Sequence, residues 1–240
     1  MPIRDMFDEM HDIATQLTMK WARYGRDSAI MVTDDFTRLT LDTLALCAMD
    51  FRFNSFYHDD MHPFIEAMGD FLTESGQRAR RPPLPALFYR AKDRKFAADI
   101  AVLRKTADDV LQQRKSQGEL NTRKDLLSAM LRNVDAKTGH KMTDQSITDN
   151  LITFLIAGHE TTSGLLSFAF YLLIKHPEEY LKAQREVDTV IGKGQIKYEH
   201  MAKLPYLNAV SSFSLVKWRL CLLFFFHALF GPACCSQDQD

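Results

Sequence analysis

A polar patch interrupts an otherwise apolar helical pattern in the second half of the sequence. The apolar pattern runs from about residue 147 to residue 174, and Gly158, Glu160 and Thr161 stand near its centre. A carboxylate buried without a partner costs much free energy, so such a patch is expected to have a partner. Thr161 can donate a hydrogen bond to the carbonyl of Ala157, which tends to bend or open a helix locally. Glu160 can move protons, so the patch is a candidate site for proton-dependent chemistry.

The same segment offers a shallow face to a large flat group. On a helical wheel one face carries six residues, Phe154, Ala157, Gly158, Thr161, Leu165 and Phe168. Ala157 and Gly158 have little or no side chain, so a bulky group can approach the backbone closely. This pattern predicts a cofactor whose reactive atom needs controlled proton delivery. A satisfied polar contact between packed helices explains the same residues equally well from the pattern alone.

The rest of the sequence is expected to be helical nearly throughout, which makes the protein mainly α. Apolar residues at three- and four-residue spacing predict helices near 6–23, 34–50, 62–79, 88–117, 123–132, 143–175 and 177–191. Pro63 and Pro177 each fall in the first turn of a predicted helix, where a missing N–H group costs nothing. Three prolines within residues 80–85 predict a loop or a polyproline segment.

Composition argues against several classes of function. The 30 basic and 31 acidic residues nearly cancel, so no charge pattern indicates nucleic acid or an anionic membrane as a partner. The longest uncharged apolar run, Leu220–Phe230, is about half of the roughly 20 residues that a membrane-spanning helix needs. The first residues lack the apolar core of a signal peptide. The four cysteines, Cys47, Cys221, Cys234 and Cys235, show no paired metal spacing. We therefore expect a cytoplasmic, reducing location.

Two histidine motifs suggest metal sites but have simpler explanations. His159 and Glu160 begin the pattern of a zinc protease, but Ser163 stands where the second histidine is required. His58 and His62 are four residues apart, directly before a proline, and a solvated loop at a helix start explains them. No metal site is predicted.

Two further motifs are interpreted as ordinary connections. Residues 192–194 are too short for a phosphate-binding loop and are typical of a helix end. Residues 82–85 fit a proline-rich ligand of an SH3-like domain, but a connection between two helices is the simpler interpretation.

The hexapeptide at residues 157–162, Ala-Gly-His-Glu-Thr-Thr, resembles the Ala/Gly-Gly-x-Asp/Glu-Thr-Thr/Ser signature of the cytochromes P-450, the haem-thiolate monooxygenases. The resemblance covers residues 1–210 and continues through the segments at 39–43, 51–57, 62–64, 176–179 and 204–207. The first three of these segments look like the soluble fatty-acid hydroxylases that are fused to an NADPH flavin reductase. The resemblance implies a partial cytochrome P-450 fold, the middle helices through the long oxygen-binding helix.

This resemblance implies roles for the residues of the central helix. Thr161 would stabilise bound dioxygen and its protonation, and Glu160 would relay protons. The haem b of the family would lie near Ala157, Gly158 and Phe154.

The resemblance also implies a substrate and an electron source. Leu72, on the helix expected at 62–79, would form part of the wall of the substrate channel. The reaction would insert one oxygen atom of dioxygen into a C–H bond of a fatty acid. Electrons would come from NADPH through the FAD and FMN of a reductase partner.

The sequence departs from the family pattern towards its end. The family's haem iron is held by a cysteine in a Phe-x-x-Gly-x-Arg-x-Cys loop. Here the residue seven positions after Phe230 is Gln237, so Cys234 and Cys235 lack the required spacing. The family's Glu-x-x-Arg pair is also missing, because Phe213 and Val216 align with its two positions.

Both the helical period and the resemblance stop near residue 210. We therefore predict two segments, a P-450-like helical fragment at 1–210 and a divergent aromatic and cysteine-rich tail at 211–240. The tail is expected to come from a gene-model error, a read-through intron or a frameshift. Two functions remain open, an incomplete fatty-acid monooxygenase that is inactive by itself and a non-catalytic helical remnant that acts as an interaction protein.

Overall fold

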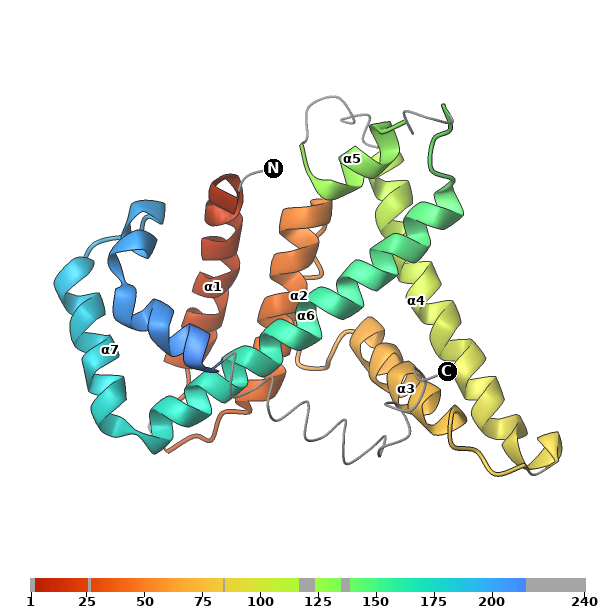
Figure 1. Ribbon diagram of the computed structural model, residues 1–240, viewed down its shortest axis with the longest axis horizontal. Helices are drawn as coiled ribbons and strands as arrows, with labels where there is room; N and C mark the ends of the chain where they lie inside the picture. Colours follow the sequence, from red (N-terminus) through yellow and green to blue (C-terminus); the bar gives the residue numbers. More distant parts are fainter. Residues whose placement is uncertain (1–2, 26, 84, 117–123, 135–138, 215–240) are drawn as a thin grey trace, which may run out of the picture. The chain divides into compact units, whose positions relative to one another are not determined.

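The computed structural model describes residues 3–25, 27–83, 85–116, 124–134 and 139–214 (Figure 1). The chain forms two compact units, Met1–Glu160 and Thr161–Asp240. Within the described ranges the chain has no β-strand, only an isolated antiparallel bridge between Val134 and Lys141. The predicted mainly α fold is therefore confirmed.

Every predicted helix is present, and its ends lie within three residues of the expected positions. The first unit contains α1 (Phe7–Ala22), α2 (Val32–Met49), α3 (Pro63–Arg78), α4 (Arg90–Ser116), α5 (Leu126–Arg132) and the first part of α6 (Asp144–Lys175). The second unit contains the end of α6, α7 (Pro177–Val190), a 3-10 helix (Tyr198–Lys203) and a helix at residues 205–214.

The proline signals mark the boundaries that they predict. Pro63 opens α3, and the Nδ1 atom of His62 accepts a hydrogen bond from the backbone N–H of Phe64 at 3.1 Å. Pro177 likewise opens α7. The described part of 80–85 is non-helical and connects α3 to a 3-10 helix at Ala86–Tyr89, as expected. Figure 1 shows the resulting hairpin of α3 and α4, in orange and yellow.

The core of the first unit fixes one side of α6. Helices α2 to α6 contribute its buried apolar residues, which include Leu41, Ala45, Met49, Phe64, Leu103, Leu111 and Leu127. The α6 residues Ile147, Leu151 and Leu155 recur every fourth position and are fully or almost fully buried. Because residues four apart lie on the same face of a helix, this stripe turns one side of α6 into the core and leaves the other side outside it.

A buried ion pair links three helices of the first unit, and the sequence did not predict it. Arg114 of α4 donates hydrogen bonds to Asp125 at 2.7 and 3.0 Å, to the Oγ atom of Ser128 at 2.7 Å, and to the carbonyl of Met49 at 2.8 Å. Burial raises the pKa of Asp125, but the hydrogen bonds from Arg114 and Ser128 outweigh burial and lower it below the usual value. The ionised pair therefore ties α4 and the start of α5 to the end of α2.

No helix in the described ranges is long and apolar enough to cross a membrane.

Two expectations about the end of the chain remain predictions. Residues 215–240 lie outside the described residues, so the predicted division at residue 210 and the aberrant origin of the tail are not tested.

Candidate functional site

The polar patch predicted from the sequence lies within a continuous helix. Every residue from Asp144 to Lys175 is α-helical, so the local opening expected around Thr161 is not present. The hydrogen bond expected from Thr161 to the carbonyl of Ala157 stays a prediction. The patch is thus presented by an unbroken helical backbone.

Four of the predicted site residues are accessible in spite of the apolar surroundings. In the first unit, Ala157 and Glu160 are exposed, and the large side chain of Phe154 is 37% exposed. Thr161, the first residue of the second unit, is exposed as well. None of these four residues belongs to the buried stripe of α6. Within the first unit, an accessible aromatic ring, a small residue and a carboxylate are compatible with the predicted contact with an apolar cofactor, which stays a prediction.

Gly158 has a packing role that the sequence did not reveal. A Cβ atom at this position would lie 2.6 Å from the Cδ2 atom of Leu44, a separation that real Cβ contacts do not show. Leu44 lies on α2 and packs against the core. The missing side chain therefore lets α6 pack closely against α2. The predicted contact of Gly158 with a cofactor stays a prediction.

A hydroxyl of α2 reinforces the same helix contact. The Oγ1 atom of Thr40 lies 3.0 Å from the carbonyl oxygen of His159 and 2.9 Å from the carbonyl oxygen of Phe36. A hydroxyl has one proton, so Thr40 donates to one carbonyl at a time. The bond to His159 joins residues 119 positions apart in the sequence and ties α2 to the backbone of α6 at the residue before Glu160.

His159 is a core residue, and its ring is bonded within its own helix. Its side chain is 1% exposed, and its Nδ1 atom lies 2.6 Å from the carbonyl oxygen of Leu155. Burial lowers the pKa of His159 below its ordinary value, although the hydrogen bond to Leu155 acts in the opposite direction. The neutral imidazole therefore donates its Nδ1–H to that carbonyl. No cluster of three metal-binding side chains occurs among the residues that the structure describes.

The sequence contained a signal for this burial that was not used. Leu151, Leu155, His159 and Ser163 follow one another at intervals of four residues, and all four are buried. His159 thus continues the core stripe of α6 in the first unit. A buried polar contact therefore holds for this side of the helix, and the cofactor contact expected for the other side stays a prediction.

The remaining predicted residues lie elsewhere on the first unit. Leu72 is half-buried on α3 and packs against the core to which Ile152 and Ile156 of α6 also contribute. Its predicted role as a channel wall stays a prediction. Cys47 is buried on α2, with its Sγ atom 3.9 Å from the carbonyl oxygen of Met6. Burial, assisted by the nearby charge of Glu9, raises the pKa of the Cys47 thiol to about 11, so this thiol is a poor metal ligand.

The contact between Gly158 and Leu44 predicts different effects for two glycine substitutions. Gly158→Ala is expected to leave the free energy of unfolding unchanged or to lower it by up to about 2 kcal/mol, because the movement that the new methyl group forces on the end of the Leu44 side chain offsets the gain in helix propensity. Gly69→Ala, in an exposed part of α3 with no atom near the new Cβ, should raise it by about 0.5–1 kcal/mol. Urea unfolding checks both. Adding Leu44→Ala should make Gly158→Ala less costly, and simple additivity of the two changes would contradict the proposed contact.

The buried imidazole predicts a pH-dependent stability. The pKa of His159 is lower in the folded than in the unfolded chain, so the unfolded chain takes up the proton first as the pH falls below about 6.5. The free energy of unfolding therefore falls with pH in this range, by at most about 1.4 kcal/mol per pH unit for one group. His62, whose pKa burial and His58 also lower, contributes in the same direction.

The substitution His159→Asn isolates the contribution of one histidine. Asparagine keeps a hydrogen-bond donor near Leu155 but does not titrate in this range. Urea unfolding at about pH 7.5 and about pH 5.5 should show a smaller loss of stability in the variant than in the original chain. An equal loss in both would show that His159 is not buried in its neutral form.

Comparison with known proteins agrees with the motif and with the fold. The family model for cytochrome P450 matches residues 2–212. A bifunctional cytochrome P450/NADPH–P450 reductase of Fusarium oxysporum is 62% identical over 209 residues, which cover 87% of this chain and 19% of the relative. The corresponding protein of Aspergillus oryzae is 56% identical over 208 residues, with the same coverage of 87% and 19%. A self-sufficient cytochrome P450 monooxygenase of Exserohilum turcicum is 53% identical over 209 residues, again covering 87% and 19%.

These matches define both the family and the extent of the similarity. The chain spans about a fifth of the length of these relatives. The matched residues include the whole of α6 with its central hexapeptide. This chain belongs to the cytochrome P450 family.

Proposed function

We propose that residues 1–210 form the oxygen-activating part of a monooxygenase that hydroxylates fatty acids. The accessible side of α6 carries this proposal, because it presents Phe154, Ala157, Glu160 and Thr161 in the sequence context of the family signature. In the proposed reaction one oxygen atom enters a C–H bond and the other leaves as water. NADPH supplies the two electrons that this balance requires.

Haem is the cofactor of this family, and when bound it supplies the activation of dioxygen. The exposed ring of Phe154 and the methyl group of Ala157 fit contact with an apolar macrocycle. The carboxylate of Glu160 is exposed, so it can exchange protons with water. We propose that Glu160 relays these protons and that the hydroxyl of Thr161 donates a hydrogen bond at the reacting oxygen.

The described residues do not supply the thiolate that the family uses as its iron ligand. Cys47 is the one cysteine among them, and its thiol is buried in the core with a raised pKa. Cys221, Cys234 and Cys235 lie outside the described residues and lack the family spacing. We therefore propose that this polypeptide alone does not form a thiolate-ligated haem complex and is inactive as a hydroxylase.

The substrate class and the electron source are further parts of the proposal. The fatty-acid class rests on the resemblance of residues 39–64 to the soluble hydroxylases, and Leu72 is the proposed channel residue. The names of two relatives include an NADPH–P450 reductase, which supports electron transfer from NADPH through FAD and FMN. The proposal includes a cytoplasmic location, supported by cysteines without disulfide spacing.

A carbon monoxide difference spectrum tests the proposed inactivity. The purified chain, expressed with added haem and reduced, should lack the red-shifted Soret band of a thiolate complex, because no suitable cysteine is available. The Fusarium oxysporum relative provides the positive control. A red-shifted band that persists in the variant Cys47→Ser and disappears when Cys234 and Cys235 are replaced by serine would overturn this part of the proposal.

A chimera tests the proposed function independently of the tail. Residues 1–210 replace the matching segment of the Fusarium oxysporum relative, and hydroxylated dodecanoate is measured against NADPH consumed. Thr161→Ala in the chimera should lower product per NADPH on the order of 10-fold or more, the scale of a general acid–base contribution. Thr153→Ala, an exposed α6 hydroxyl bonded to the carbonyl of Asp149 at 2.8 Å, is the matched control and should not change this ratio.

The outcomes separate the two function classes. An active chimera that depends on Thr161 supports the monooxygenase. A chimera that binds haem but shows no effect of Thr161→Ala contradicts the role of this residue. A folded chimera without haem would favour the alternative, a non-catalytic helical interaction protein.

A further inference from the structure

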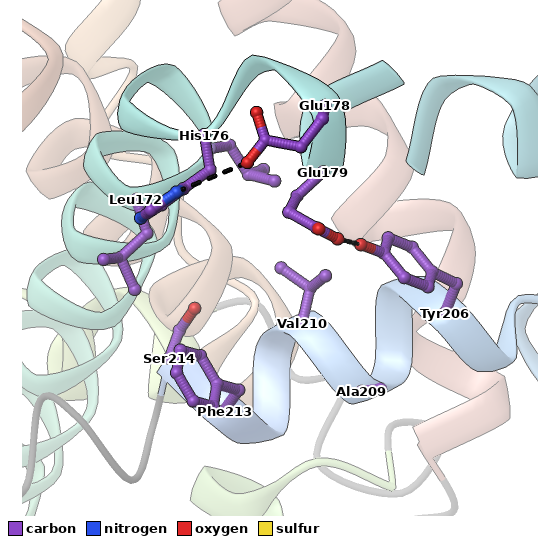
Figure 2. Close-up of a pocket in the computed structure, with 10 residues that line it drawn as sticks. Leu172, His176, Glu178, Glu179, Tyr206, Ala209, Val210, Phe213 and Ser214 are labelled. Carbon is purple, nitrogen blue, oxygen red and sulfur yellow. Dashed lines mark hydrogen bonds and ion pairs between the residues drawn. The ribbon is translucent and has the colours of Figure 1, made fainter. Parts of the chain in front are cut away.

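The second unit contains a cavity of about 400 Å³ that the proposed function does not use (Figure 2). It lies in the corner between the end of α6 and the start of α7, and the helix at 205–214 forms its other wall. Its lining residues are Leu172, Leu173, His176, Glu178, Glu179, Tyr206, Ala209, Val210, Phe213 and Ser214. A volume of this size is typical of sites for small organic molecules, which usually occupy about 300–1,000 Å³.

Hydrogen bonds between α7 and the helix at 205–214 hold the walls of this cavity in place. The carboxylate of Glu186 accepts from the backbone N–H groups of Tyr206 at 2.8 Å and Leu207 at 2.9 Å. These are among the first N–H groups of that helix, which lack partners within it, so Glu186 caps the helix from outside. The hydroxyl of Tyr206 also donates to Glu179. The cavity is therefore formed before any ligand arrives.

One part of the cavity wall is apolar and another is acidic. Leu172, Val210 and Phe213 supply apolar surface, and Figure 2 shows the side chain of Val210 directed into the space between the helices. The acidic part consists of Glu178, whose carboxylate lies 3.6 Å from His176, and Glu179. Hydrogen bonds from Lys182 and Tyr206 lower the pKa of Glu179, which keeps this carboxyl ionised. Lys182 balances one of the two carboxylates, so the acidic part favours a cation.

The buried hydroxyl of Ser214 is a second polar group in the cavity wall. Ser214 is fully buried, and within the described residues its Oγ atom has no hydrogen-bond partner. Figure 2 shows this hydroxyl pointing from the end of the helix towards the side of the cavity that Leu172 lines. A buried polar atom without a partner is costly, and a ligand group that bonds to it removes this cost.

We propose that this cavity binds a hydrophobic amine that carries a hydroxyl group away from its nitrogen. The ammonium group would lie beside Glu178, the hydrocarbon part against Leu172, Val210 and Phe213, and the hydroxyl would bond to Ser214. A primary amine is protonated at neutral pH, since its pKa is near 10.4 as in lysine. Binding requires no haem, so it does not depend on the proposed monooxygenase.

Three probes of equal chain length test this assignment on the full, haem-free chain by isothermal titration calorimetry. They are 8-amino-1-octanol, octylamine without the hydroxyl, and 8-hydroxyoctanoate with the opposite charge. The amino alcohol should bind saturably at one site. Octylamine should bind about 3- to 10-fold more weakly, the scale of one hydrogen bond. The hydroxy acid should bind at least about 10-fold more weakly, because its carboxylate faces Glu178.

Variants locate the binding in the cavity. Glu178→Gln should weaken binding of the amino alcohol about 3- to 5-fold, the scale of an exposed ion pair. Ser214→Ala should weaken binding of the amino alcohol but leave the binding of octylamine unchanged. Val210→Trp fills the cavity and should abolish binding. Lys193→Gln, outside the lining, is the control for charge changes. Circular dichroism and thermal unfolding confirm that each variant folds like the original chain.

Several results would overturn the proposal. They are the absence of saturable binding to the original chain, equal or tighter binding of the hydroxy acid, and unchanged binding in a folded Val210→Trp variant. Binding that Ser214→Ala weakens equally for the amino alcohol and for octylamine would remove the assigned role of the serine.

Discussion

The close contact of α2 with α6 decides how the central helix can be used. Gly158 has no side chain to keep Leu44 away, and Thr40 bonds to the carbonyl of His159 across 119 residues of sequence. Once this contact and the buried stripe through Leu155 are fixed, the rotation of α6 about its axis is fixed as well. Residues on a helix keep a constant angular spacing, so burial of one stripe determines which residues face outward. Phe154 and Glu160 are accessible for this reason.

Polar groups inside the first unit act as links between distant segments. Asp42 on α2 accepts hydrogen bonds from the backbone and side chain of Ser55 at 2.8 and 2.6 Å. Burial raises the pKa of Asp42 despite these bonds. Arg114 similarly joins α4 to Asp125. Because an unpaired buried polar group is costly, each of these pairs favours one arrangement of its helices over others. The arrangement of α2, α4 and α5 thus rests on satisfied polar contacts as well as on apolar packing.

The two candidate sites differ in how their polar side chains are placed. On α6 the polar residues separate by side, with a neutral His159 in the core and Glu160 in contact with solvent. This separation gives one helix both an anchor and a chemically accessible surface. In the second unit, a hydrogen bond between Glu186 and Tyr206 joins α7 to the helix at 205–214, and the adjoining cavity combines apolar walls with Glu178 and Ser214. A cavity of that composition suits the hydrophobic amine that we propose as its ligand, independent of the family chemistry.

The sequence by itself determined the helices, their ends and the family. Helical periodicity and helix-start prolines such as Pro63 and Pro177 act over a few residues, so they can be recognised without the fold. The hexapeptide at 157–162, together with the surrounding segments that resemble the family, identified the family that the comparison then showed. Tertiary structure alone decided that Gly158 packs on Leu44 and that Arg114 meets Asp125. These contacts join residues far apart in sequence, and local patterns carry no information about which distant side chain fills a given space.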